Sequence, residues 1–200
     1  MAHLTKLAGF SNKVVMNLFR LIPNTLILGA FTFVAPFLPL QGAEAPSTFK
    51  VGEFSFSRPA AWDWIPTSSS MRKAELKIND AAHKETAEVA FFHFGEGGGG
   101  GTKANIDRWL SQFQEPRDKL QSKVEETTVN KRKITYVQAQ GTYLSGMPGA
   151  AKTPQPNTML LGAILESQQG NVFIRLTAPL QLAAASQAAF RKMVEGGSPN

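Results

Sequence analysis

The chain has 200 residues, of which 42% are hydrophobic and 18% charged, which suits one globular domain with a short extension. It contains no cysteine, which excludes disulfide scaffolds, thiolate zinc sites, iron–sulfur clusters and cysteine nucleophiles. The formal net charge is +6, but Lys6, Lys13 and Arg20 lie in an N-terminal segment without acidic residues. Beyond that segment the charges nearly balance, so we expect no nucleic-acid partner.

Residues 1–45 are predicted to form a secretory signal peptide. The segment Leu21–Leu40 has no charge, a basic residue precedes it, and Ala43-Glu44-Ala45 after it matches the A-x-A cleavage pattern. Met16 is an alternative start, because the shorter segment that begins there has more usual dimensions for a signal. The globular domain is then residues 46–200, in the periplasm or outside the cell.

An uncleaved anchor in the inner membrane is the alternative for the same N-terminal segment. A run of about 20 apolar residues is long enough to span a bilayer. Pro23, Pro36 and Pro39 weaken this alternative, because each proline interrupts a helix and frees backbone groups that a lone span cannot satisfy.

The exported part is predicted to be an α+β domain with a mostly antiparallel sheet of about six to seven strands and helices packed on both faces. Three segments are apolar on both faces and belong in the middle of the sheet: 88–94, 159–165 and 172–177. The other predicted strands are 51–57, 74–78, 123–129 and 133–143, followed by a long loop over 145–157.

Two helices are expected to cover this sheet. The first begins with Thr102 as its N-cap and ends before Pro116, with one apolar stripe that includes Trp109. The second runs from about Leu180 to Val194 and ends at two glycines.

The glycine-rich segment Gly95–Thr102 lies between a predicted strand and the first helix. It satisfies the G-x-G-x-x-G dinucleotide pattern, but a run of glycines does so trivially, and the chain lacks repeated strand–helix units. A flexible loop is the plain interpretation. The alternative is an anion site, in which backbone N–H groups at the helix start hold a phosphate, sulfate or carboxylate beside Lys103.

A polar stripe on the same helix extends this candidate site. Asn105, Arg108 and Gln112 recur at helical spacing, although a solvated face is the favoured interpretation of this stripe. Tryptophans in the loop after the first strand are further candidates. The predicted ligand-binding residues are Gly97, Gly98, Gly99, Gly100, Gly101, Thr102, Lys103, Asn105, Arg108, Trp62, Trp64 and Arg175.

Arg175 is singled out because it lies within an apolar strand, where a charge needs a partner. Two alternatives follow. Either Arg175 forms a structural ion pair with Glu75 or Glu88, or it binds an anion.

Signatures of hydrolases are weak. Ser70 and Lys73 match S-x-x-K, but they open an alternating strand, which places the two side chains on opposite faces. His83 and His93 show no metal-ligand spacing. We assign no catalytic residue, metal or cofactor, and a small periplasmic hydrolase using carboxylates or His93 remains the enzyme alternative.

Several of these features together resemble an uncharacterised family of exported bacterial proteins with a PsbP-like α/β/α sandwich. They are Trp62 and Pro66 after the first strand, the Phe-rich strand that runs into Gly95, and Asn105-Ile106-Asp107-Arg108-Trp109. The resemblance covers about residues 54–190 and implies a binding or assembly module. We therefore expect a non-catalytic module that binds a small anionic ligand or an unknown protein, with a membrane-anchored structural protein as a further alternative.

Overall fold

The computed structural model describes residues 45–146 and 149–199, all within one compact unit. Almost all of the expected signal peptide, and with it the alternative of an anchor, lies outside the described residues. In the part that is described, no helix is long and apolar enough to cross a membrane.

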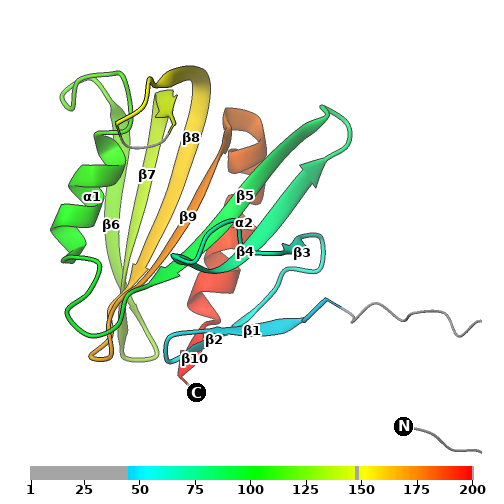
Figure 1. Cartoon of the computed structure of the whole chain (residues 1–200), viewed down its shortest axis with the longest axis vertical. Coiled ribbons are helices and arrows are strands. Elements are labelled where there is room, and N and C mark those ends of the chain that lie inside the picture. Colours follow the sequence, from blue (N-terminus) through cyan, green and yellow to red (C-terminus); the bar gives the residue numbers. More distant parts are fainter. Residues whose placement is uncertain (1–44, 147–148, 200) are drawn as a thin grey trace, which may run out of the picture. The chain divides into compact units, whose positions relative to one another are not determined.

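A seven-stranded antiparallel sheet forms the body of this unit (Figure 1), in the order β3-β4-β5-β9-β8-β7-β6. The predicted, mostly antiparallel sheet is confirmed, but residues 51–57, which were expected to form a strand, are not part of it. Its strands are β3 (Asp63–Ile65), β4 (Arg72–Asp80), β5 (Glu85–His93), β6 (Gln121–Val129), β7 (Arg132–Ser145), β8 (Thr153–Leu165) and β9 (Val172–Pro179).

A second, three-stranded sheet was not expected. It consists of β1 (Thr48–Val51), β2 (Phe54–Ser57) and β10 (Ser198–Pro199). The prediction of one strand over residues 51–57 is wrong because the chain reverses at Gly52. The φ of +58° at this glycine is a conformation that a residue with a Cβ adopts only with strain.

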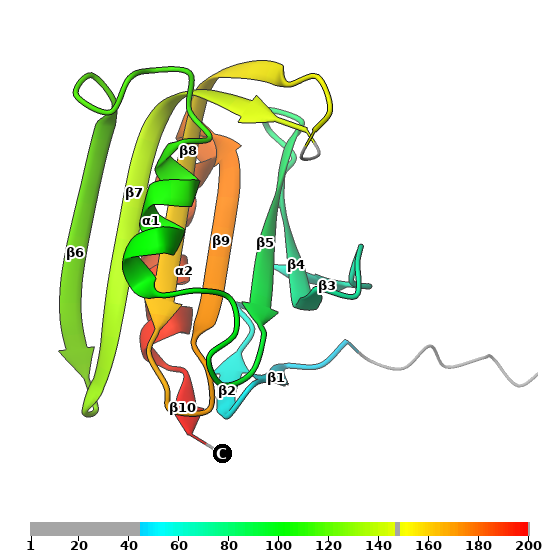
Figure 2. The same cartoon turned by 60° about the vertical axis from the view of Figure 1, so that its left-hand side comes forward.

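The central strands separate two hydrophobic clusters, as their apolar residues on both faces indicated. On β8, Leu160 and Ile164 pack with α1 (Thr102–Leu110), whereas Leu161 and Ala163 pack with α2 (Leu180–Glu195). In Figure 2, α1 lies in front of β7 and β8, and α2 lies behind the sheet. We call these two sides the α1 face and the α2 face.

The ends of β7 and β8 bend over the α1 face (Figure 2). A register shift between Gly141 and Tyr143 and a φ of +51° at Asn157 produce the bend. The predicted loop over 145–157 is thus largely strand, with Tyr143 paired to Gln155. This bent ribbon contacts the segment after α1, where the Leu144 N–H donates to the Gln112 carbonyl at 2.7 Å.

Candidate functional site

The glycine-rich loop before α1 is tied to the helix by one buried amide. Asn105 is fully buried, and its Nδ2 donates to the carbonyls of Gly99, Gly100 and Gly101 at 2.9, 3.3 and 3.0 Å. The Oδ1 of Asn105 accepts a hydrogen bond from Arg108. Asn105 therefore holds the loop on one side and orients Arg108 on the other.

Close packing explains at least one of the glycines. A Cβ on Gly99 would lie 2.7 Å from the rings of both Phe94 and Phe173, and the φ of Gly99 is +78°. The loop follows the end of β5 and lies against this aromatic pair. Gly99 thus has a structural reason that does not depend on a ligand.

The start of α1 differs from the expectation. Gly101, not Thr102, occupies the N-cap position, and no side chain caps the helix there. The Thr102 hydroxyl instead donates to Glu166 at 3.0 Å. Lys103 forms the i,i+4 ion pair with Asp107, with 2.6 Å between Nζ and Oδ2. Both side chains are thus engaged with carboxylates of the protein.

Neither candidate tryptophan of the β3 region packs with α1. Trp62 is buried in the α2-face cluster, and Trp64 packs partly buried against it, with ring centroids 5.2 Å from Phe49. The structure therefore places these two tryptophans apart from the loop and from Arg108.

Arg175 lies on β9 and points to the α1 face, between Ala90 of β5 and Gly162 of β8. Its Nη1 donates to the Oε1 of Gln112 at 3.1 Å. The expected ion pair with Glu75 or Glu88 is wrong, because both carboxylates bind Arg72 instead. Among the residues that the structure describes, Arg175 has no carboxylate partner.

Two further arginines lie near Arg175. Burial lowers its pKa, and repulsion by Arg72 and Arg108 acts in the same direction, while Tyr143 opposes them. We call Arg72, Arg108 and Arg175 the arginine corner. Arg72 is neutralised by its carboxylates, but Arg108 and Arg175 contact only neutral amide oxygens in the hydrogen bonds found here. Such guanidinium groups can receive a carboxylate or phosphate.

A groove with a volume of about 610 Å³ adjoins the arginine corner. Thr177, which lies two residues along β9 from Arg175 and on the same face, forms part of its wall. The buried Thr177 hydroxyl has no hydrogen-bond partner within residues 45–146 and 149–199. Gln155 lines the same groove and pairs with Tyr143, whose hydroxyl donates to Gln112 at 3.1 Å.

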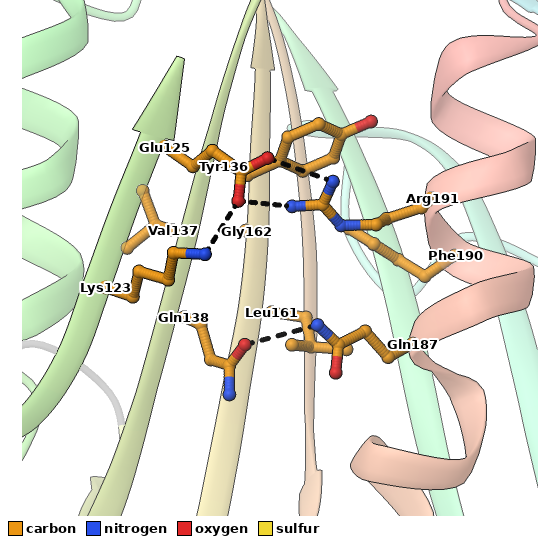
Figure 3. A pocket seen from close by; sticks show the side chains of 10 residues that line it. All are labelled: Lys123, Glu125, Tyr136, Val137, Gln138, Leu161, Gly162, Gln187, Phe190 and Arg191. Carbon is orange, nitrogen blue, oxygen red and sulfur yellow. Dashed lines mark hydrogen bonds and ion pairs between the residues drawn. The ribbon is translucent and has the colours of Figure 1, made fainter. Parts of the chain in front are cut away.

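A smaller cavity of about 40 Å³ lies on the α2 face, between the sheet and α2 (Figure 3). Arg191 forms an ion pair with Glu125 at 3.0 Å and covers the ring of Tyr136 at 4.2 Å. Lys123 contacts the same Glu125 at 3.0 Å. Figure 3 shows these groups pointing toward one another, so Arg191, unlike Arg175, has a carboxylate partner within the protein.

The residues considered for hydrolysis lie in separate places. His83 is exposed and bound to Asp80 at 2.8 Å. His93 is partly buried at the end of β5, where its ring lies against Gly52 between the two sheets. No group of three or more His, Asp and Glu side chains suited to a metal ion occurs in the described part of the chain.

Sequence reasoning found part of the arginine corner. Arg108 and Arg175 were named, and Gln112 was noted on the polar stripe. Arg72, Tyr143 and Thr177 were missed. The alternation of Ile174 and Leu176 with Arg175 and Thr177 was a readable signal for a polar surface on one face of β9.

No family model matches the chain, and neither does any curated protein. Among solved structures, the chain is similar to the solution structure of cyanobacterial PsbP (CyanoP) from Synechocystis sp. PCC 6803. The two share 7% sequence identity over 80% of this chain and 96% of that chain, with a TM-score of 0.48. A likeness of this extent says nothing about a ligand. The resemblance to an exported bacterial family stays a prediction.

Proposed function

We propose that the protein is an exported, non-catalytic module that binds a small anion at the arginine corner. The observation that carries this proposal is Arg175, a partly buried guanidinium without a carboxylate among the described residues. An uncompensated charge of this kind is costly to bury. A ligand carboxylate or phosphate would offset that cost with two parallel hydrogen bonds.

The residues around Arg175 have complementary roles in this proposal. Arg108 supplies a second positive charge, and Asn105 fixes its side chain. Gln112 orients Arg175 and is itself fixed by the Tyr143 hydroxyl. The glycine-rich loop contributes indirectly, since its carbonyls hold Asn105 in place.

Export is the remaining part of the proposal, and it rests on the uncharged segment Leu21–Leu40 and the small residues after it. A soluble anion or an acidic group on another protein would then be met outside the cytoplasmic membrane.

The test is an NMR titration of the full chain with acetate and, separately, inorganic phosphate. We expect saturable shifts of the Arg175 and Arg108 side-chain Nε–H signals with at least one anion. Arg175→Gln should weaken binding by at least about tenfold, because a hydrogen bond to a charged group is lost. Arg191→Gln is the matched control and should bind as the wild type does. Absence of saturable shifts, or unchanged binding by Arg175→Gln, would contradict the proposal.

A further inference from the structure

If the proposed function holds, the groove beside the arginine corner indicates which class of anion binds there. Arg175 and Thr177 are alternate residues of one strand, so their Cα atoms lie about 7 Å apart. Gln112, which binds Arg175, also binds Tyr143 of the bent ribbon. The Arg175 guanidinium therefore reaches toward the end of the sheet where the groove opens.

The groove walls offer both hydrogen-bond donors and acceptors, since threonine hydroxyls and the Gln155 amide line it together with Glu88 and prolines. The Leu144 N–H points away from β8, since it donates to Gln112, and Leu144 is paired with Pro154. The backbone of Pro154, and of Pro156 two residues on, then faces the groove without an N–H. The Pro156 carbonyl already accepts from the Thr158 hydroxyl at 3.4 Å. Across the groove lies Glu88, whose carboxylate is 56% exposed and is paired with Thr177 in the strand register.

Walls that both donate and accept suit ligand groups that can do the same. Glu88 shares Arg72 with Glu75, so these two carboxylates face one arginine, and the remaining negative charge disfavours a second negative charge on the ligand beyond the one at Arg175. Hydroxyl groups meet both conditions, and the buried Thr177 hydroxyl still needs a partner. A volume of about 610 Å³ is also larger than a bare inorganic ion fills and lies within the usual range for small-molecule sites.

We infer that the ligand is a polyhydroxylated monocarboxylate, that is, a sugar acid, with its carboxylate at Arg175 and its hydroxyl groups along Thr177 and Glu88. The extended body is what distinguishes this ligand from acetate or phosphate.

The test compares gluconate, acetate and uncharged glucose by isothermal titration calorimetry on the full chain. We expect gluconate to bind at least about fivefold more tightly than acetate, the effect of one further hydrogen bond, and glucose not to bind measurably. Thr177→Val should remove the advantage of gluconate and leave acetate unchanged. Thr135→Val is the matched control, because its buried hydroxyl also lacks a partner in the described part but lies on β7, outside the groove lining.

Both threonine variants should keep or slightly raise Tm, since each removes a buried hydroxyl without a partner. If only Thr177→Val then loses affinity for gluconate, the loss is due to a missing ligand contact and not to misfolding. The inference is overturned if gluconate and acetate bind equally, or if Thr177→Val weakens both acids alike or neither. The inference is also overturned if no acid binds the wild type, and the proposed function fails with it only if inorganic phosphate does not bind either.

Discussion

Arg175 and Arg191 are both partly buried arginines beside the same sheet, but they lie on opposite faces and in opposite electrostatic settings. Arg191 on the α2 face has the Glu125 carboxylate at 3.0 Å and the Tyr136 ring at 4.2 Å. Arg175 on the α1 face has a neutral amide at 3.1 Å and two arginines nearby. The first charge is compensated within the protein, whereas the second is not.

The difference separates a stabilising contact from a candidate binding contact. Buried charges in proteins are usually paired with an opposite charge. A partly buried guanidinium that has only a neutral acceptor therefore lowers the stability of the fold. Such a cost is expected where function requires a guanidinium group whose N–H donors are available to a ligand. The same kind of substitution should therefore change the free energy of unfolding differently on the α1 face and on the α2 face.

The largest effect is expected when the buried amide of the α1 face is removed. Asn105→Ala leaves three loop carbonyls and Arg108 without their partner and should lower the free energy of unfolding by about 2 kcal/mol. Gln187→Ala, which breaks one contact with Gln138 on the α2 face, should cost about 0.5 kcal/mol. Urea unfolding measures both, and equal losses would break the comparison.

A smaller effect, of opposite sign on the two faces, is expected for the arginines themselves. Arg175→Met should raise the free energy of unfolding by about 1 kcal/mol, because it removes an uncompensated charge from a partly buried place. Arg191→Met should lower it by about 1 kcal/mol through loss of the contact with Tyr136. Thermal unfolding of the two variants decides the matter. Destabilisation by Arg175→Met would mean that Arg175 supports the fold.

Alkaline pH should weaken the α2 face in particular. Burial, with the nearby Glu195 carboxylate, raises the pKa of Tyr136 well above its usual value of 10. Above pH 10 the unfolded chain loses the Tyr136 proton before the folded one does, so stability falls as the pH rises toward the folded pKa. Tyr136→Phe should lose less stability than the wild type over this range. Equal slopes in unfolding experiments from neutral pH to pH 11 would contradict the role of Tyr136.

The smallest effects are expected at the exposed ion pairs, of which we compare one on each face. Lys103 contacts Asp107 at 2.6 Å on α1, and Lys123 contacts Glu125 at 3.0 Å on β6. The lysine side chains are 90% and 71% exposed, so solvent and salt screen both pairs. Lys103→Ala and Lys123→Ala should unfold as the wild type does, and a clear shift in either would show an unrecognised role.

Apolar patterning predicted the sheet well where both faces of a strand are buried. The segments 88–94, 159–165 and 172–177 correspond to β5, β8 and β9, which lie together in the centre. Patterning failed at the start of β8, because Pro154 and Pro156 are typical of loops. There the strand is held by pairing with β7 and by a bend, neither of which follows from local composition.

The candidate site was harder to predict for a related reason. Arg175 was recognised as a charge that needs a partner, but the partner depends on register across three strands. Glu75 pairs with Ala90 next to Arg175, yet Arg72 reaches it from within the same strand. No pattern in a single sequence shows whether Arg72 or Arg175 binds Glu75 and Glu88, because both arginines lie on strands near these carboxylates.

Pro154 and Pro156 have a further consequence for the protein in concentrated solution. Strand β8 extends past its last pair with β9, Thr158 with Pro179, and so presents an open edge. An open edge invites another chain to add a strand, which is a common route to fibrillar aggregates. Because neither proline has an N–H to offer, two copies cannot form a continuous ladder there, and the same residues that line the groove help to keep the molecules separate.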